Sequence, residues 1–545
     1  MVKFGTALLS AAAVSVLGAS PSAAATILQK FDGVSLRDFI TASNGFGTTP
    51  PDMAGAVSNT HVMQVVNGGV AIFDRSGNRL SYQRTDQFIS AAGVPVSFQN
   101  SPFDPRLKYD PNSKRFFGVM ESVGPPGGTM APSNGRDFPK LGEDGESEGA
   151  ELHNVLLGPD GNPVPGQQGV SSTPNNPIYV FVSKTSNPLD GFNAVKFNTS
   201  QSLFGDFPTL GLTRDALTIT TNDFDDHSLQ SVSIFSIPKA DLLQNAPSLA
   251  NMTRLEGLDP ALFGFAVQGV NNDGPSNGTQ KLVAISAVAY NQENISQLAF
   301  NGNGRVVGLT PEGATAILYD GDTRGSRQPV LVSPPLDGGG DRISNDVHQV
   351  GNYIYVTHTY GDGQFGAPTH FNGIAYEIID ATTNLVVAQG NIEDPNMDFT
   401  HSSITPDSTG KYFALAYTGS GPDHAITAYA NVCTFDSVAL STHCGNRLTV
   451  MEGLDPGYVL TLGGDRNRWG DYSDVQWDQL TGTFWLFQEY PGLRGGNAPP
   501  NSGRWNTVIS QISVPEPATW AMMMLGFGFV GFGMRRTRRP TISYA

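Results

Sequence analysis

Short runs of apolar and β-branched residues, separated by turn-forming residues, recur along most of the chain. Between residues 26 and 514, none of them extends into the 3.6-residue apolar spacing of a long amphipathic helix. Runs of this kind, bounded by Gly, Pro, Asn and Asp, are typical of strands. The pattern therefore predicts an all-β body. The expected strands cover Val62–Val66, Val70–Phe73, Phe116–Met120, Ile178–Val182, Leu217–Thr221, Leu282–Ala287, Tyr353–Thr357, Tyr412–Tyr417 and Phe484–Phe487.

One hairpin unit repeats. A strand ends in Asp, a few turn residues follow, and a second strand begins with an aromatic or aliphatic residue. The unit occurs at residues 72–82, 108–120, 378–388, 404–417 and 476–487. An Asp at the entry to a turn accepts hydrogen bonds from backbone N–H groups two residues on. Repeated hairpins at this spacing predict a β-propeller, most simply one of seven blades, around a central channel. A large β-sandwich or jelly roll would give a similar pattern and stays open as the alternative.

Composition agrees with a loop-rich β protein, since the chain contains 63 Gly and 37 Pro. Residues 121–177 are rich in Gly, Pro and acidic residues and contain little strand pattern. We expect this segment to be an exposed insertion in a body that spans residues 26–514.

Both ends of the chain indicate export. Residues 1–25 combine Lys3, the apolar run Ala7–Leu17 and three alanines, which predicts a signal peptide cut by signal peptidase after Ala25. Near the other end, Ala518–Met534 contains no charged residue and is followed by an arginine cluster. This layout predicts a short transmembrane helix in the inner membrane with its arginines on the cytoplasmic side.

Four elements follow one another in this tail: Pro515-Glu516-Pro517, then Trp520-Ala521, then the Gly- and Phe-rich apolar segment, then Arg535, Arg536, Arg538 and Arg539. Residues 515–539 thus resemble a PEP-CTERM sorting signal of the PEPxxWA type. The resemblance implies processing by an exosortase, a membrane enzyme that cuts near the motif and releases or re-anchors its substrate at the cell surface. It also implies an origin in cells that often make exopolysaccharide. An ordinary single-pass anchor remains the alternative.

Two further segments, residues 50–74 and 468–490, resemble parts of large secreted bacterial β-propeller proteins. This resemblance implies an architecture and no particular activity.

Charge excludes one class of partner. The whole chain has a formal charge of −17, and residues 26–514 carry 27 basic and 48 acidic residues, a charge of −21. Such a surface repels phosphate backbones, so we expect no nucleic-acid binding. It suits an exported protein, or one that collects divalent cations. The two cysteines, Cys433 and Cys444, are expected to form a disulfide that closes a short loop.

Oxygen-rich loops suggest calcium as a possible ligand. Asp223 and Asp225 lie in one acidic turn, and Asp320 and Asp322 lie in another. Calcium prefers six to eight oxygen ligands and is bound by such loops. Because no complete EF-hand is present, solvated turns remain the alternative reading.

Two histidines could suggest a metal site, and one Ser/His/Asp group could suggest a catalytic triad. A two-residue turn at Gly351-Asn352 would pair His348 with Tyr355, which places His348 and His358 on opposite faces of their hairpin. The two histidines are therefore not expected to bind one metal. Asp398, His401 and Ser402 lie close in sequence without a nucleophile elbow, so we expect a structural turn.

Glycan hydrolysis needs two carboxylates across a cleft. The candidates Asp104, Asp206, Asp346 and Asp471 recur at equivalent places in the repeat, which favours a structural role. Large aromatic side chains would either stack on sugars or fill the core: Trp469, Tyr472, Trp477, Trp485 and Trp505.

The sequence as a whole predicts an exported cell-surface or extracellular-matrix protein. Its propeller body is expected to be non-enzymatic and to bind polysaccharide, protein or calcium. A secreted glycan hydrolase with paired acids in the channel is the alternative.

Overall fold

The structure is a computed structural model that describes residues 24–123, 175–200, 202–225, 228–289, 291–319, 321, 323–329, 334–362, 370–460, 467–493 and 504–515. The chain divides into two compact units. One comprises residues 25–514; the other combines residues 1–24 with residues 515–545. The predicted signal peptide and the predicted helix at 518–534 lie outside the described residues, apart from Ala24 and Ala25. Where the structure describes the chain, no helix has the length and apolarity needed to cross a membrane.

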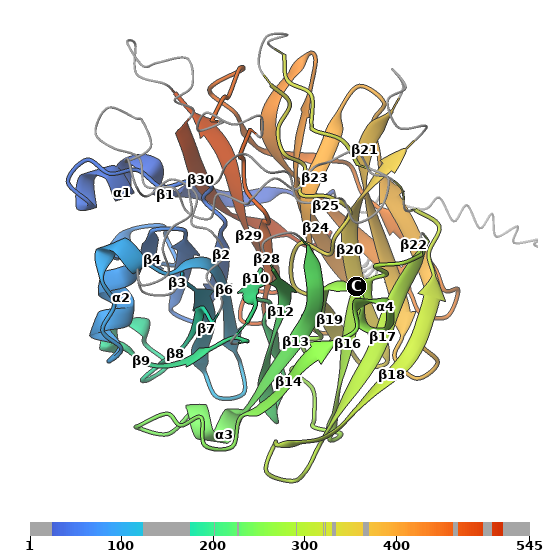
Figure 1. Cartoon of the computed structure of the whole chain (residues 1–545). Helices are drawn as coiled ribbons and strands as arrows, with labels where there is room; N and C mark the ends of the chain where they lie inside the picture. The colour runs from blue at the N-terminus through green and yellow to red at the C-terminus, as the bar shows by residue number, and fades with distance from the viewer. Residues whose placement is uncertain are drawn as a thin grey trace, which may run out of the picture. The chain divides into compact units, whose positions relative to one another are not determined.

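The body is a seven-bladed β-propeller, in which each blade is one antiparallel sheet (Figure 1). The first blade contains β2 (Ala54–Val57), β3 (His61–Val66), β4 (Gly69–Asp74) and β5 (Arg79–Arg84). The second contains β6 (Phe103–Asp110), β7 (Arg115–Glu121), β8 (Pro177–Ser183) and β9 (Phe192–Asn198). The third contains β10 (Phe204–Asp206), β11 (Gly211–Leu212), β12 (Ala216–Phe224), β13 (Leu229–Pro238) and β14 (Thr253–Leu258).

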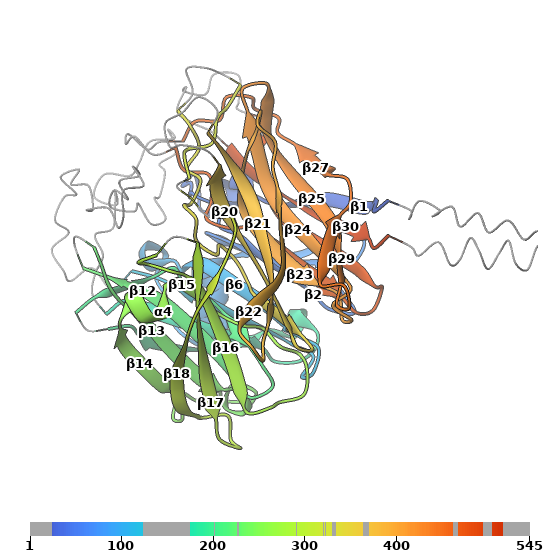
Figure 2. The same ribbon diagram turned by 90° about the vertical axis from the view of Figure 1, so that its right-hand side faces the viewer.

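The remaining four blades follow in chain order (Figure 2). The fourth contains β15 (Phe265–Gly269), β16 (Thr279–Ile285), β17 (Gln292–Phe300) and β18 (Val306–Ala316). The fifth contains β19 (His348–Val350), β20 (Tyr353–Asp362), β21 (Phe371–Asp380) and β22 (Leu385–Ile392). The sixth contains β23 (Asp398–Pro406), β24 (Tyr412–Gly421), β25 (His424–Asp436), β26 (Ser441–Cys444) and β27 (Leu448–Glu452). The seventh contains β28 (Asp474–Asp478), β29 (Thr483–Gly492), β30 (Arg504–Ser513) and β1 (Ile27–Ser35).

The seventh blade closes the ring, because it joins the start of the body to its end. β1 pairs antiparallel with β30, with Phe31 opposite Ile509, so the blue strand lies beside the red one in Figure 1. Two hydrogen bonds tie the ends of these strands together. The Thr26 backbone N–H donates to Ser513 Oγ, and the Ser513 N–H donates to the Thr26 carbonyl, both at 2.9 Å.

Short helices lie in the connections. They are α1 (Leu36–Ala42), α2 (Thr85–Ala91), η1 (Phe98–Asn100), η2 (Pro188–Asp190), α3 (Lys239–Leu242) and α4 (Pro260–Phe263). The first is capped by Ser35, whose hydroxyl accepts from the Asp38 N–H while the Asp38 carboxylate accepts from the Ser35 N–H. Such a reciprocal cap fixes a helix start.

Apolar side chains hold the blades to one another. Buried clusters lie between each pair of neighbouring blades around the ring. Between the seventh and first blades, Trp485 and Trp505 pack with Val62 and Phe73. Because alternate residues of a strand point to opposite faces, each central strand contributes to two of these clusters.

The predicted fold class is confirmed, and the sandwich alternative is excluded by the seven separate sheets. Each expected strand lies in an observed one, except that Ser286 and Ala287 fall beyond the end of β16 at Ile285. The repeated turn chemistry is also confirmed: each strand-end Asp accepts from backbone N–H groups of its own turn. These residues are Asp74, Asp110, Asp380, Asp407 and Asp478. Most of the expected insertion, residues 124–174, lies outside the described residues between β7 and β8.

Candidate functional site

A cavity of about 530 Å³ lies where the first strands of the seven blades end. Every blade contributes to its lining, through Val57, Lys108, Leu212, Asn271, His348, Thr405 and Gln476. Its position therefore depends on closure of the whole ring. A cavity of this size falls within the usual range for small-molecule sites, roughly 300 to 1,000 Å³.

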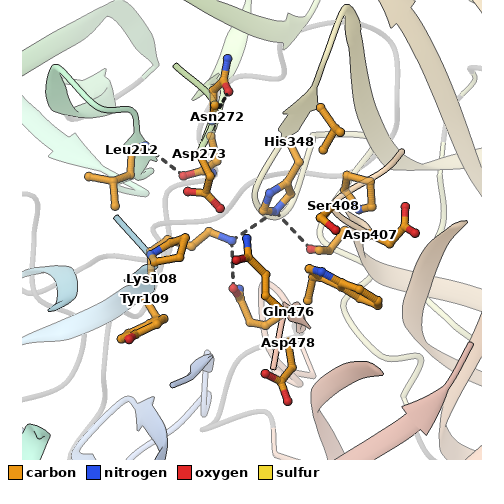
Figure 3. A pocket seen from close by; sticks show the side chains of 18 of the residues that line it. Lys108, Tyr109, Leu212, Asn272, Asp273, His348, Asp407, Ser408, Gln476 and Asp478 are labelled. Carbon is orange, nitrogen blue, oxygen red and sulfur yellow. Dashed lines mark hydrogen bonds between the residues drawn. The ribbon is translucent and has the colours of Figure 1, made fainter. Parts of the chain in front are cut away.

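The lining is mainly polar and rich in side-chain amides (Figure 3). Amide and hydroxyl groups come from Asn59, Asn271, Asn272, Gln349, Gln476, Gln479, Thr405 and Ser408. Two aromatic side chains, Tyr109 and Trp477, are half-buried at the cavity wall. Amides both donate and accept hydrogen bonds, so this lining suits a ligand that carries many hydroxyl groups.

Lys108 and the polar side chains that it contacts form one wall of the cavity, called its floor below. Its ammonium forms an ion pair with Asp346 at 2.8 Å and donates to Gln476 Oε1 at 3.2 Å. It also lies 3.1 Å from His348 Nε2. An ammonium group can only donate, so Nε2 accepts, and the ring is neutral with its proton on Nδ1. Burial, and then the Lys108 charge, hold the pKa of His348 well below its ordinary value.

Asp474 lies buried behind this floor. Its carboxylate accepts from the Gly55 N–H at 2.9 Å and from Gln476 Nε2 at 2.8 Å. Burial is the main reason that its pKa rises to about 7; Lys108 opposes the rise and Asp346 adds to it. The Gln476 amide is thus held at its oxygen by Lys108 and at its nitrogen by Asp474.

Three carboxylates face the cavity, and they differ in their partners. Asp407 accepts from the Thr409 N–H and hydroxyl, and Asp478 accepts from the Leu480 N–H and pairs with Arg75. Asp273 follows β15 and keeps solvent-exposed surface. Its carboxylate has no hydrogen-bond or ion-pair partner among the described residues. Enclosure by the cavity, followed by the charge of Asp110, raises the pKa of Asp273 to about 6.

A second set of buried arginines and acids does not line the cavity. Arg106 donates to the Pro208 and Ser344 carbonyls, both at 3.0 Å, and its guanidinium lies 3.7 Å from the centre of the Tyr472 ring. Asp471 pairs with Arg342 at 2.8 Å and with Arg468 at 3.0 Å. The candidate acid Asp471 is thus held between two arginines.

Three buried carboxylates could hold a metal ion. One oxygen of each of Asp104, Glu121 and Asp206 lies within 4.8 Å of the others. Sequence reasoning named Asp104 and Asp206 as candidate acids but missed Glu121, which pairs with Phe103 across β6 and β7. The only signal for Glu121 was its place at the end of an apolar strand, which does not distinguish a ligand from any other strand-end residue.

The calcium prediction at the other acidic loops remains a prediction. Asp223 is buried, and its carboxylate accepts from the hydroxyls of Thr221, Ser231 and Ser233. Burial raises its pKa to about 6. Asp225 caps its own turn through the Ser228 N–H, and Asp320 and Asp322 lie outside the described residues.

The expectation for the two histidines agrees with the structure. The turn expected at Asp398, His401 and Ser402 is wrong, because these residues lie within strand β23. His348 is paired with Tyr355, and His358 lies instead beside Glu377, at 3.5 Å. Asp398 is held by Arg324 and Arg327 and contacts neither His401 nor Ser402 in any described hydrogen bond.

The predicted disulfide between Cys433 and Cys444 is present, and it joins directly opposed residues of β25 and β26. Of the five aromatic candidates, Trp469, Tyr472, Trp485 and Trp505 are buried in the core. Trp477 alone reaches the cavity.

Comparison with known proteins adds one specific finding. The model of the PEP-CTERM protein-sorting motif matches residues 513–539. This match bears out the predicted sorting signal and implies export with processing by an exosortase-type system. No curated protein matches the chain.

Solved structures are similar to the chain only at very low identity and low TM-score. A hypothetical selenium-binding protein from Sulfolobus tokodaii is 7% identical with a TM-score of 0.35, covering 76% of this chain and 81% of its own. The WD40 domain of SCAP from fission yeast is 8% identical with a TM-score of 0.30, covering 86% and 83%. Semaphorin 2a from Drosophila is 8% identical with a TM-score of 0.33, covering 90% and 76%. Such values carry no argument about activity. The chain is therefore a seven-bladed β-propeller that carries a PEP-CTERM protein-sorting motif at residues 513–539.

Proposed function

We propose that this protein is an exosortase-processed surface or matrix protein whose propeller binds extracellular saccharide in the cavity at the channel mouth. The observation that carries the proposal is the cavity lining: many amide side chains beside two half-buried aromatic rings. Sugar hydroxyls need partners that donate and accept, and the C–H faces of sugar rings pack on aromatic surfaces.

Binding is favoured over hydrolysis by the state of the acids. Asp407 and Asp478 are engaged in their own turns, which leaves Asp273 as the carboxylate that faces the cavity without a protein partner in the described structure. Hydrolysis by two carboxylates would need a second one across the sugar. The acids named from the repeat, such as Asp346 and Asp471, are instead buried in ion pairs with Lys108 and with arginines.

Calorimetry with the purified full-length protein tests the proposal. The ligands are oligosaccharides released from the extracellular polysaccharide of the producing cells. Wild type is expected to bind, and Trp477→Ala is expected to bind at least about tenfold more weakly, because the variant removes an aromatic wall of the cavity. Leu480→Ala is the matched control, since Leu480 is 57% exposed on the same turn and does not line the cavity. Absence of binding by wild type would refute the proposal.

Delivery to the surface has a separate test. Cells that make wild type are compared with cells that make a variant in which Pro515, Glu516 and Pro517 are all replaced by Ala. The wild-type protein is expected at the surface or in the medium, and the variant in the membrane fraction. Identical distribution and identical mobility on a denaturing gel would contradict exosortase processing of this tail.

A further inference from the structure

The charges around the channel-mouth cavity indicate what kind of saccharide it accepts. Its acidic lining residues are Asp273, Asp407 and Asp478, against two cations, Lys108 and Lys114. The charge of Asp478 is already matched by Arg75. The charge of Lys108 is already matched by Asp346 at 2.8 Å. His348 adds no positive charge, because burial and then the Lys108 charge lower its pKa and keep its ring neutral. An anionic sugar would therefore meet a surplus of negative charge.

Asp273 is the residue whose charge is left uncompensated by the protein. Three cations lie near enough to influence it: Lys108, Lys239 and Arg214. Each of these three cations has a polar partner other than Asp273. Lys108 pairs with Asp346, Lys239 pairs with Asp110 at 2.8 Å, and Arg214 donates to the Gly274 carbonyl at 2.9 Å.

The fourth charge that influences Asp273 is Asp110, which repels it. Asp273 is exposed to the cavity, and a carboxylate without a protein partner can form a charge-assisted contact with a ligand of opposite charge. The protein supplies a neutral donor nearby, His348 Nδ1–H, which has no hydrogen-bond partner in the described part of the chain. The cavity thus offers one anionic acceptor and one neutral donor, both lining the same space (Figure 3).

We propose that the saccharide recognised here carries a primary ammonium group, as a non-acetylated amino sugar does, and that the Asp273 carboxylate binds this group. The inference rests on the proposed function and names its ligand class. Acetylation of the amine would remove the positive charge and convert a charge-assisted contact into a neutral one. Neutral sugars would bind more weakly for the same reason.

Calorimetry on the full-length protein at pH 7.5 tests the assignment with two probes. They are the β-1,4-linked disaccharide of glucosamine and its di-N-acetylated form. Wild type is expected to bind the amine form at least about tenfold more tightly. Asp273→Asn should abolish this preference, whereas Asp423→Asn, at an exposed turn away from the cavity, should preserve it.

A second measurement at pH 5 separates charge from shape. Asp273 becomes protonated as the pH falls through about 6, whereas the sugar amine stays charged. The preference for the amine form should therefore be lost at pH 5. Equal binding of both disaccharides at pH 7.5 would overturn this inference and leave saccharide binding intact. A preference that survives in Asp273→Asn would overturn the assignment to Asp273. Failure of both disaccharides and of the cell's own oligosaccharides would overturn the proposed function as well.

Discussion

Replacing Glu489 by Gln should make the protein more stable, by an amount that grows with pH. Glu489 lies on β29 with 3% of its surface exposed, and neither carboxylate oxygen has a hydrogen-bond partner within the described ranges. The side chain is closely packed, since a Cβ added at Gly470 would lie 2.5 Å from Oε1. Gln has nearly the same shape, so the substitution changes charge and leaves the packing in place.

The expected magnitude follows from the shift in the Glu489 pKa. Burial, and then the charges of Asp52 and Asp471, raise this pKa well above its ordinary value, while Arg468 opposes the rise. The folded protein therefore keeps a proton that the unfolded chain releases at about pH 4.3. A raised folded-state pKa contributes stability that is complete below the unfolded pKa and is lost as the pH rises toward the folded one. The loss is about 1.4 kcal/mol per pH unit.

Urea unfolding followed by tryptophan fluorescence between pH 4 and pH 8 measures this difference. At pH 4 the free energies of unfolding of wild type and Glu489→Gln should be similar. Above that pH the free energy of unfolding of the variant should exceed that of wild type by about 1.4 kcal/mol more for each pH unit. This increase should stop when the pH reaches the pKa of Glu489 in the folded protein. Glu452→Gln is the control, because Glu452 is an exposed carboxylate on β27. A pH-independent difference, or one equal to that of the control, would refute this account of Glu489.

Three further substitutions test the packing of the ring by urea unfolding. Asp398→Ala removes a buried carboxylate that pairs with two arginines, and should cost about 3 kcal/mol or more because it strands their charges; an effect below 1 kcal/mol would contradict this role. Replacing Cys433 and Cys444 together by Ser opens a link across 11 residues and should cost about 3 kcal/mol at most; reducing agent should have the same effect on wild type and none on the variant. Trp505→Ala should lower the free energy of unfolding by about 3 to 5 kcal/mol, since the fully buried indole packs where the seventh blade meets the first. Limited proteolysis of this variant should then cut first near β1. First cleavage elsewhere would contradict the idea that the contact between the seventh and first blades opens first.

The strands and hairpins could be predicted because their signals are local. Apolar runs such as Phe484–Phe487 mark central strands, and an Asp at a strand end marks a turn whose hydrogen bonds the structure contains. The spacing of these units favoured seven blades, but insertions such as residues 121–177 blur the period, so the spacing alone left the number open. The pairing of β1 with β30 could not be predicted from the sequence, since the partners are more than 470 residues apart and neither carries a signal for the other.

The candidate site was harder to predict than the fold. His348 was assigned to a strand end with the correct partner, Tyr355, yet nothing near it in sequence pointed to Lys108. Their contact spans 240 residues and exists because the second and fifth blades both face the channel. Asp273 was missed for a related reason: in sequence it is an ordinary loop Asp, and only the assembled ring encloses it.

The seventh blade contains strands from both ends of the body, so it can form only after the last strand is available. β30 lies between β29 and β1, so the sheet is incomplete until residues near 513 have crossed the membrane. If export begins at the N-terminus, as the predicted signal peptide would require, β1 stays without its partner for almost the whole of translocation. The match to the sorting motif begins at Ser513, the last residue of β30. Retention of the tail during export would give this final strand time to dock, so that release by processing follows ring closure instead of preceding it.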